Sequence, residues 1–159
     1  SVRLPKMRPG IQRPRTVAGR TVVETAVRRQ RGEVVMKTII AGSRSITDRE
    51  LVNKAVMDSG FTISVVFCGC AQGVDNLGRE WAVKRGIPVR LFPAEWDLHG
   101  KSAGMIRNEQ MSSEAEACIL IWDGVSKGSQ NMKKKAIFRR LKFHELIVDS
   151  PAGKNIDGL

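Results

Sequence analysis

Five short runs of mostly apolar, often β-branched residues recur along the chain, and segments with helical spacing separate them. Uninterrupted apolar runs of about four to eight residues are typical of strands that are buried on both faces, whereas apolar positions three and four apart are typical of helices. The pattern predicts strands at residues 37–41, 63–68, 88–92, 117–122 and 144–149, and helices at residues 47–58, 75–85, 103–113 and 128–140.

Strict alternation of strand and helix predicts an α/β fold: an open, doubly wound, mainly parallel sheet of about five strands with helices on both faces. Thr47 is the expected N-cap of the first helix, and residues 93–101 are expected to form a loop. The folded domain is expected at residues 36–149, because Met36 opens the first convincing strand and is a candidate natural start. Residues 150–159 contain Gly and Pro and are expected to form a loose tail.

The composition excludes several classes of protein. The chain has 159 residues, 42% of them apolar and 27% charged, which suits one globular domain. No apolar run approaches the roughly 20 residues that a membrane span needs, so no membrane partner is expected. Three cysteines, two of them at positions 68 and 70, cannot build a disulfide framework, so a reducing, cytoplasmic location is expected. No second Cys or His pair has ligand spacing, so no metal site is predicted.

The net charge of +11 is concentrated in an N-terminal arm, residues 1–35, where nine basic residues face two acidic ones. The arm is interpreted either as a solvated or vector-derived tail or as a segment that neutralises nucleic-acid phosphates. A second basic cluster is predicted on the last helix, where lysines 133–135 precede two arginines and another lysine. In the nucleic-acid alternative, the contacts are Arg13, Arg15, Arg28, Arg29, Lys133, Lys134 and Lys135.

Three predicted strands end in loops of the same kind, at residues 41–45, 69–75 and 123–129. Each combines glycine, which lets the backbone approach a ligand closely, with a following helix whose N-terminus favours anions. Gly128 and Ser129 form the best candidate phosphate cradle, and Arg44 is a candidate charged donor. Neither G-x-G-x-x-G nor the Walker pattern is present, which argues against ordinary dinucleotide-dependent dehydrogenases and P-loop NTPases.

These loops carry a family resemblance. The segments MKTIIAGSRSITD (36–48), CGCAQGVD (68–75), FPAEW (92–96), GKSAGMIRNEQM (100–111) and WDGVSKGS (122–129) resemble the YspA/YpsA-related branch of the SLOG superfamily, which also contains Smf/DprA and the Lonely guy enzymes. The resemblance covers about residues 36–148. It implies a Rossmann-like domain that binds a nucleotide or a nucleotide sugar, as a ligand sensor or a low-activity enzyme. It implies no certain cofactor, and many relatives dimerise, so a homodimer is a further expectation.

The resemblance also implies site residues. Arg107 matches the arginine that Lonely guy enzymes place beside the ribose phosphate, so it is the candidate catalytic residue. Apart from the resemblance, Trp96 lies in the loop predicted at residues 93–101, where it is interpreted either as stacking on a nucleobase or as packing against the protein. The expected ligand-binding residues are Gly42, Ser43, Arg44, Gly69, Gly73, Asp75, Trp96, Arg107, Asn108, Ser126, Gly128 and Ser129. The alternative implied by Smf/DprA is a DNA-binding protein that uses the arm and the last helix.

The sequence departs from the Lonely guy enzymes at one position. Those enzymes carry a glutamate where this chain has Met132, and a thioether can neither activate water nor stabilise an oxocarbenium-like charge. Phosphoribohydrolase activity is therefore not expected. Glu95, Asp97 and Glu109 are the nearby carboxylates that could substitute.

Overall fold

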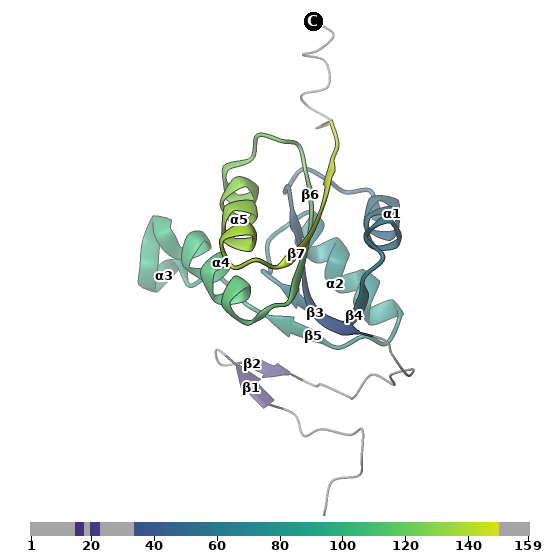
Figure 1. Cartoon of the computed structure of the whole chain (residues 1–159). Coiled ribbons are helices and arrows are strands. Elements are labelled where there is room, and N and C mark those ends of the chain that lie inside the picture. The colour runs from purple at the N-terminus through teal and green to yellow at the C-terminus, as the bar shows by residue number, and fades with distance from the viewer. Residues whose placement is uncertain (1–14, 18–19, 23–33, 150–159) are drawn as a thin grey trace, which may run out of the picture.

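The computed structural model describes residues 15–17, 20–22 and 34–149, and its centre is a five-stranded sheet with helices on both faces (Figure 1). The strands are β3 (Val35–Gly42), β4 (Thr62–Cys68), β5 (Val89–Leu91), β6 (Ala117–Trp122) and β7 (Lys142–Ile147). They lie in the order β5-β4-β3-β6-β7, and every neighbouring pair is parallel. The predicted doubly wound, Rossmann-like α/β fold is confirmed, and the sheet is parallel throughout.

The strand order creates a crevice at the carboxyl edge of the sheet. The chain runs outward from β3 to β4 and β5, and then returns to place β6 and β7 on the opposite side of β3. In such sheets, ligands bind where the order reverses, because the loops on the two sides diverge there. Here that point lies between β3 and β6, whose last paired residues are Gly42 and Ile121.

Two hydrophobic cores lie on opposite faces of the sheet. Helices α1 (Arg49–Ser59) and α2 (Val74–Lys84) cover the face that carries Ile40, whereas α4 (Ala103–Glu114) and α5 (Lys127–Phe138) cover the face that carries Ile39 (Figure 1). Successive strand residues point to opposite faces, so a strand that is apolar at every position supplies both cores. β6 shows this most fully, since all six of its residues are buried.

Asp48, rather than the predicted Thr47, caps the first helix. The Asp48 side chain accepts a hydrogen bond of 3.0 Å from the backbone N–H of Glu50, and Thr47 is exposed. Either residue type suits an N-cap, so the sequence pattern could not choose between adjacent candidates. The helix ends at Gly60, which has φ of +72°.

The segment predicted as a loop at residues 93–101 contains a short helix, α3 (Trp96–His99), and a 3₁₀ turn, η1 (Gly100–Ser102). The backbone N–H groups of Leu98 and His99 donate to the Glu95 carbonyl oxygen at 3.1 and 2.9 Å. Local hydrogen bonds of this kind order a segment too short for hydrophobic periodicity to reveal.

β7 runs from Lys142 to Ile147, so each of its ends lies two residues earlier than in the strand predicted at residues 144–149. Lys142 belongs to the strand because it pairs with Ala117 of β6. α5 ends at Phe138 rather than at the predicted residue 140.

Two short strands, β1 (Arg15–Val17) and β2 (Arg20–Val22), pair antiparallel within the predicted arm. The sequence pattern did not predict these two strands, although each has the sequence Arg-Thr-Val, in which Thr and Val favour β-structure. The remainder of the arm and the predicted tail at residues 150–159 lie outside the described residues. Within the described part of the chain, no helix has the length and apolar character that a membrane span requires.

Candidate functional site

A pocket of about 570 Å³ opens at the carboxyl edge of the sheet, where the loops after β3 and β6 meet α4. Its lining includes ten of the predicted ligand-binding residues: Gly42, Ser43, Arg44, Asp75, Trp96, Arg107, Asn108, Ser126, Gly128 and Ser129. Gly69 and Gly73 do not line it. Residues that we did not predict also contribute, namely Ala41, Ser45, Ala71, Lys101, Gly104, Met105, Met111, Lys127 and Asn131.

The N-terminus of α5 presents unpaired donors to this pocket. The N-cap residue Ser126 makes no side-chain capping bond, and no acceptor within the described residues pairs with the N–H groups of residues 127–129. Ser129 is only 5% exposed and lines the pocket, yet its hydroxyl has no hydrogen-bond partner in the described part of the chain. Unpaired N–H groups at a helix start attract anions, and the helix dipole adds to the effect.

The Ser126 hydroxyl is occupied in joining the loops after β3 and β6. It donates to Asp123 Oδ1 at 2.7 Å and lies 2.9 Å from the hydroxyl of buried Ser43. Because the Ser126 proton points to Asp123, the Ser43 hydroxyl donates to Ser126, and it also accepts the Asp123 N–H at 3.1 Å. Ser43 therefore makes its visible bonds to the protein, and its expected contact with phosphate stays a prediction.

Asp123 organises the loop that precedes α5. Its Oδ1 atom accepts hydrogen bonds from the N–H groups of Val125 and Ser126, at 2.9 and 2.8 Å, in addition to the Ser126 hydroxyl. Partial burial would raise the pKa of Asp123, but the side-chain bond from Ser126 and the backbone donors outweigh burial and lower it. The ionised carboxylate thus fixes the conformation of the loop at neutral pH.

Arg107 is anchored on the opposite wall. Its Nη1 group donates to the Gly69 carbonyl oxygen, and its Nε group donates to Asn108 Oδ1 at 2.9 Å. A Cβ atom at Gly69 would lie 2.6 Å from Arg107 Nη1 and 2.7 Å from Asp75 Oδ2. Glycine at this position therefore makes room for a neighbouring arginine and carboxylate rather than for direct approach of a ligand.

Asp75 is a buried carboxylate at the base of the pocket. Its Oδ2 atom accepts a hydrogen bond from the Ala71 N–H at 3.2 Å, and the residue as a whole is 5% exposed. Burial raises the pKa of Asp75, and the Arg107 guanidinium, the N–H groups of Ala71 and Gly42, and Arg44 oppose that shift. Asp75 thus links the loops after β3 and β4 to α4.

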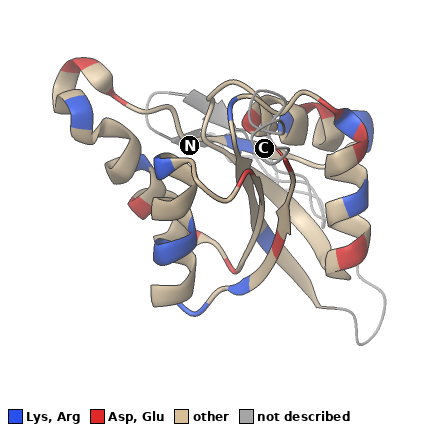
Figure 2. Ribbon diagram, turned by 90° about the horizontal axis from the view of Figure 1, so that it is seen from above, with Lys and Arg blue, Asp and Glu red and all other residues tan. Residues whose placement is uncertain are grey.

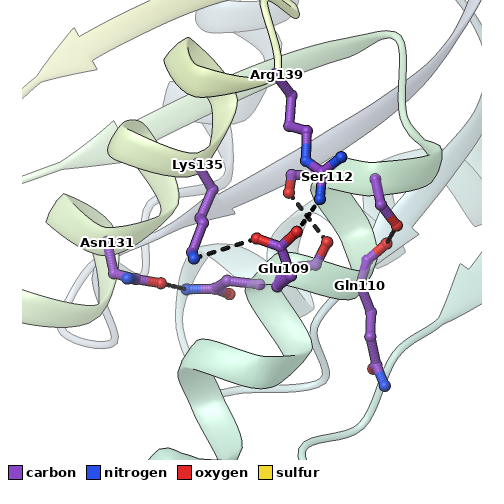
Figure 3. Close-up of polar contacts among 8 residues, drawn as sticks. Glu109, Gln110, Ser112, Asn131, Lys135 and Arg139 are labelled. Atoms are coloured by element: carbon purple, nitrogen blue, oxygen red, sulfur yellow. Dashed lines mark hydrogen bonds and ion pairs between the residues drawn. The ribbon is translucent and has the colours of Figure 1, made fainter.

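Asn108 uses its whole side-chain amide inside the protein. Its Nδ2 group donates to the Gly128 carbonyl oxygen at 3.3 Å and to Asn131 Oδ1 at 3.0 Å, while its Oδ1 atom accepts from Arg107. The residue is 6% exposed. These bonds place Asn108 between Arg107 and the start of α5, and Figure 3 shows its bond to Asn131. Its predicted contact with a ligand stays a prediction.

Glu109 forms a second link between α4 and α5. Its carboxylate lies between Lys135, at 3.1 Å, and Arg139, as Figure 3 shows. These two cations lower the pKa of Glu109, with the hydrogen bond from Arg139 as the largest cause. Glu109 does not line the pocket, so it is unsuited to the substitute catalytic role considered above. Glu95 and Asp97 are exposed and do not line the pocket either.

Gly42 and Gly73 are crowded by the protein itself. A Cβ atom at Gly42 would meet the Ile121 carbonyl oxygen, and one at Gly73 would meet the carbonyl oxygens of Ser43 and Arg44. Gly73 also has φ of +75°, which side chains disfavour. Gly128, in contrast, has open space where a Cβ would stand. The glycines of the first two loops thus let these loops pack closely against the protein, whereas Gly128 has open space beside it.

The charged residues that line the pocket are mostly basic. Arg44, Lys101, Arg107 and Lys127 come from four different elements or loops, and Asp75 is the single acidic residue in the lining. Trp96 and Met105, which are 51% and 54% exposed, add apolar surface to the same lining. A ligand with both an anionic part and a flat apolar part would match this surface.

Comparisons with known proteins identify the family of this chain. The model of the YspA, cpYpsA-related SLOG family matches residues 36–99. The Gene 61 protein of Mycobacterium phage D29 is 34% identical over 110 residues, which cover 63% of this chain and 87% of the phage protein. The chain belongs to the YspA, cpYpsA-related SLOG family. No solved structure matches it.

The matched SLOG segment carries only part of the pocket. Residues 36–99 contain the loops after β3 and β4, together with Asp75 and Trp96. Arg107 and the α5 N-terminus lie beyond residue 99. In this SLOG protein, Arg107 and the unpaired N–H groups at the start of α5 therefore lie outside the segment that the family model matches.

The SLOG pocket holds a thioether where Lonely guy enzymes carry glutamate. Met132 lines the pocket, is 1% exposed, and packs in the hydrophobic core with Met111. Its neighbours are apolar, which suits a methionine and would penalise an ionised carboxylate. The expected absence of hydrolase activity stays a prediction.

The basic cluster that we predicted on the last helix of this SLOG protein is dispersed. Lys133 bonds to Glu145 of β7 at 3.1 Å, Lys135 bonds to Glu109 of α4, and Lys134 is exposed. Consecutive helical residues point about 100° apart, so three of them cannot share one face. Figure 2 shows basic and acidic positions interspersed over the helices on both sides of the sheet.

The nucleic-acid alternative now depends mainly on the arm. Arg13, Arg28 and Arg29 lie outside the described residues, and Arg15 is described only as part of the backbone of β1. Contact of the arm with nucleic acid, a homodimer and a cytoplasmic location all stay predictions.

Proposed function

We propose that this protein binds a nucleotide or a nucleotide-derived sugar, with the ligand's phosphate at the N-terminus of α5 and its base against Trp96. The observation that carries the proposal is the Ser129 hydroxyl, which belongs to a residue that is 5% exposed, lines the pocket and has no hydrogen-bond partner among the described residues. This hydroxyl lies at a helix N-terminus with unpaired N–H groups, so it can add one more hydrogen bond to a ligand oxygen there.

The surrounding charge supports a phosphate rather than a neutral group. The N–H groups of residues 127–129 and the Lys127 side chain are on one wall, and Arg107 is on the other. Charge-assisted hydrogen bonds to phosphate are about twice as strong as neutral ones. Removal of the phosphate from a ligand should therefore cost more affinity than removal of its base.

A thermal-shift and calorimetric panel tests the proposal directly. We expect AMP, ADP-ribose, NAD or a cyclic nucleotide to raise the melting temperature, and a ligand at 100 times its Kd should add about 2.7 kcal/mol of stability. The matched probe is adenosine, which lacks the phosphate and should bind more weakly than AMP. The absence of any shift with every phosphorylated member at millimolar concentration would overturn the proposal.

Matched variants locate the binding site. Ser129→Ala should weaken binding of a responding nucleotide about fivefold, because about 1 kcal/mol of hydrogen bonding is lost. At low salt, Lys127→Ala should weaken nucleotide binding more than Ser129→Ala does. The control is Lys134→Ala, which removes the same charge from an exposed position on the same helix and should leave the affinity unchanged. Equal effects of the two lysine variants would show that only overall charge matters.

We infer that the bound nucleotide is sensed rather than cleaved. Asp75 is the one carboxylate in the lining, and it is already bonded to a backbone N–H, while Met132 occupies the position of the Lonely guy glutamate. Incubation with AMP should therefore release no free adenine, as measured by chromatography. Steady release that Arg107→Ala abolishes would instead assign the protein a phosphoribohydrolase activity.

A further inference from the structure

Two cysteines flank Gly69 where β4 ends, and they contact one another. The backbone N–H of Cys70 donates to Cys68 Sγ at 3.3 Å, and the Cys70 thiol donates to the Cys68 carbonyl oxygen at 3.7 Å. Cys70 has φ of +64°, a left-handed conformation that folds the turn back toward Cys68. The third cysteine, Cys118, is buried in β6 and takes no part in these contacts.

The two thiols differ in access to solvent. Cys70 is exposed, so a small oxidant can reach it, whereas Cys68 is 1% exposed and donates to the Asp75 carbonyl oxygen at 3.4 Å. The hydrogen bond with the Cys70 thiol, followed by burial and the nearby Asp75 charge, raises the pKa of Cys68 well above its usual value. Cys70 is thus the sulfur that oxidant meets first, and Cys68 is a protonated neighbour beside it.

We propose that Cys68 and Cys70 form an oxidation site, at which a hydroperoxide converts the two thiols into an intramolecular disulfide. An exposed thiol with a second cysteine in contact is the arrangement that lets an oxidised sulfur be captured before it is oxidised further. The glycine between them gives the small ring the backbone freedom that closure requires.

The chemistry proceeds in two balanced steps. First, Cys70 sulfur attacks one peroxide oxygen, an S–O bond forms as the O–O bond breaks, and the departing oxygen takes the Cys70 thiol proton, which gives a Cys70 sulfenic acid and water or an alcohol. Second, Cys68 sulfur attacks Cys70 sulfur, the S–O bond breaks, and the departing hydroxide takes the Cys68 proton to form water. The thiols lose two electrons and two protons in total, and the peroxide gains them.

Disulfide formation would alter the pocket through Gly69. The thiol hydrogen bonds to the carbonyl oxygens of Cys68 and Asp75 are lost when the two sulfur atoms are joined. Closure also draws the Cβ atoms to about 3.8 Å apart, which changes the turn at residue 69. The carbonyl oxygen of Gly69 is the acceptor for Arg107, so the turn carries the change to the arginine on the pocket wall.

Thiol counting on the full chain tests the proposal without any ligand. Trypsin leaves both cysteines in one peptide, residues 55–79, because cleavage follows Lys54 and Arg79. After hydrogen peroxide treatment, denaturation and alkylation, we expect one labelled cysteine, Cys118, instead of three, and peptide 55–79 should be lighter by two hydrogen atoms. Dithiothreitol should restore three labels. A Cys70 sulfinic acid with Cys68 still alkylated, or Cys70-linked dimers, would overturn the proposal.

Matched variants identify the sulfur that reacts first. Cys70→Ser should leave Cys68 and Cys118 fully alkylated after the same peroxide treatment, whereas Cys68→Ser should leave a Cys70 sulfenic acid that dimedone traps. Cys118→Ser should still form the disulfide. If Cys68→Ser yields no dimedone adduct, oxidation does not begin at Cys70 and the proposed sequence of steps is wrong.

The effect on the pocket rests on the proposed function and has its own measurement. Peroxide should weaken AMP binding about tenfold or more, dithiothreitol should restore it, and Cys70→Ser should bind AMP with or without peroxide. If the reduced protein binds no nucleotide, the proposed function fails while the thiol count still decides the disulfide. If it binds AMP equally in both states, the coupling to Arg107 is wrong.

Discussion

The side-chain amide nitrogen of Asn108 lies 3.0 Å from the side-chain oxygen of Asn131, and this bond ties α4 to α5 beside the pocket. The same amide holds the Gly128 carbonyl oxygen and accepts from Arg107. One buried group therefore sets the separation between the arginine and the helix N-terminus that we propose to share a phosphate.

Asn108→Asp keeps the size of this side chain but replaces its two N–H donors with an acceptor. The Gly128 and Asn131 oxygens then lose this donor and face a carboxylate, and the carboxylate oxygen buried at position 108 lacks a donor on that side, at a cost of roughly 1–3 kcal/mol. We expect a lower midpoint in urea unfolding and an AMP affinity reduced at least about tenfold. Asn53→Asp, the same change on α1, which contributes no residue to the pocket lining, is the control and should alter neither measurement substantially.

Gly73→Ala tests whether the loops after β3 and β4 need glycine for packing. The added methyl group would meet the Ser43 and Arg44 carbonyl oxygens, and φ of +75° adds strain. Gly60→Ala is a matched control, because Gly60 has φ of +72° but open space around its missing Cβ. We expect Gly60→Ala to cost about 1–2 kcal/mol from the left-handed conformation alone, and Gly73→Ala to cost clearly more, as measured by denaturant unfolding. Equal costs would contradict the packing argument.

Asp75 should make stability depend on pH in an unusual direction. Burial raises its pKa in the folded protein, so the folded state keeps the proton to a higher pH than the unfolded chain. The contribution of Asp75 to stability is therefore fully present below its ordinary value of 3.8, and it is lost as the pH rises through the raised value. The stability of Asp75→Asn relative to the unaltered protein should increase over that interval and then level off. A stability difference that does not change with pH would show that Arg107 and the backbone donors fully compensate for burial.

The sequence pattern predicted the sheet well because the strands are apolar at nearly every position. β6 is the clearest case, since all six residues are buried and periodicity leaves little choice of structure. The pattern failed where local hydrogen bonds decide the structure, as at Asp48 and in α3, and where Arg-Thr-Val segments pair with one another in the arm. These features depend on one or two bonds rather than on a repeated hydrophobic period.

Prediction of the site was limited in a different way. The loop motifs identified half of the residues that line the pocket, because parallel strands bring their carboxyl ends to one edge of the sheet. They could not show that Ser43 and Asn108 bond to the protein, because a motif lists residues without their orientation. The same reasoning could have identified Lys127 as a pocket residue, because it directly precedes Gly128 in the third loop. Lys101 and Met105 have no such signal.

The residues that line the pocket come from two separate stretches of chain, residues 41–75 and residues 96–132. The first stretch is constrained by close packing at Gly42 and Gly73, so most changes there would disturb the scaffold. The second presents side chains such as Trp96, Lys101 and Met105 from helix surfaces that face solvent. Substitution of those side chains would change which ligand the pocket recognises while the strands beneath it stay intact. Homologues are therefore expected to differ in ligand selectivity mainly through residues 96–132.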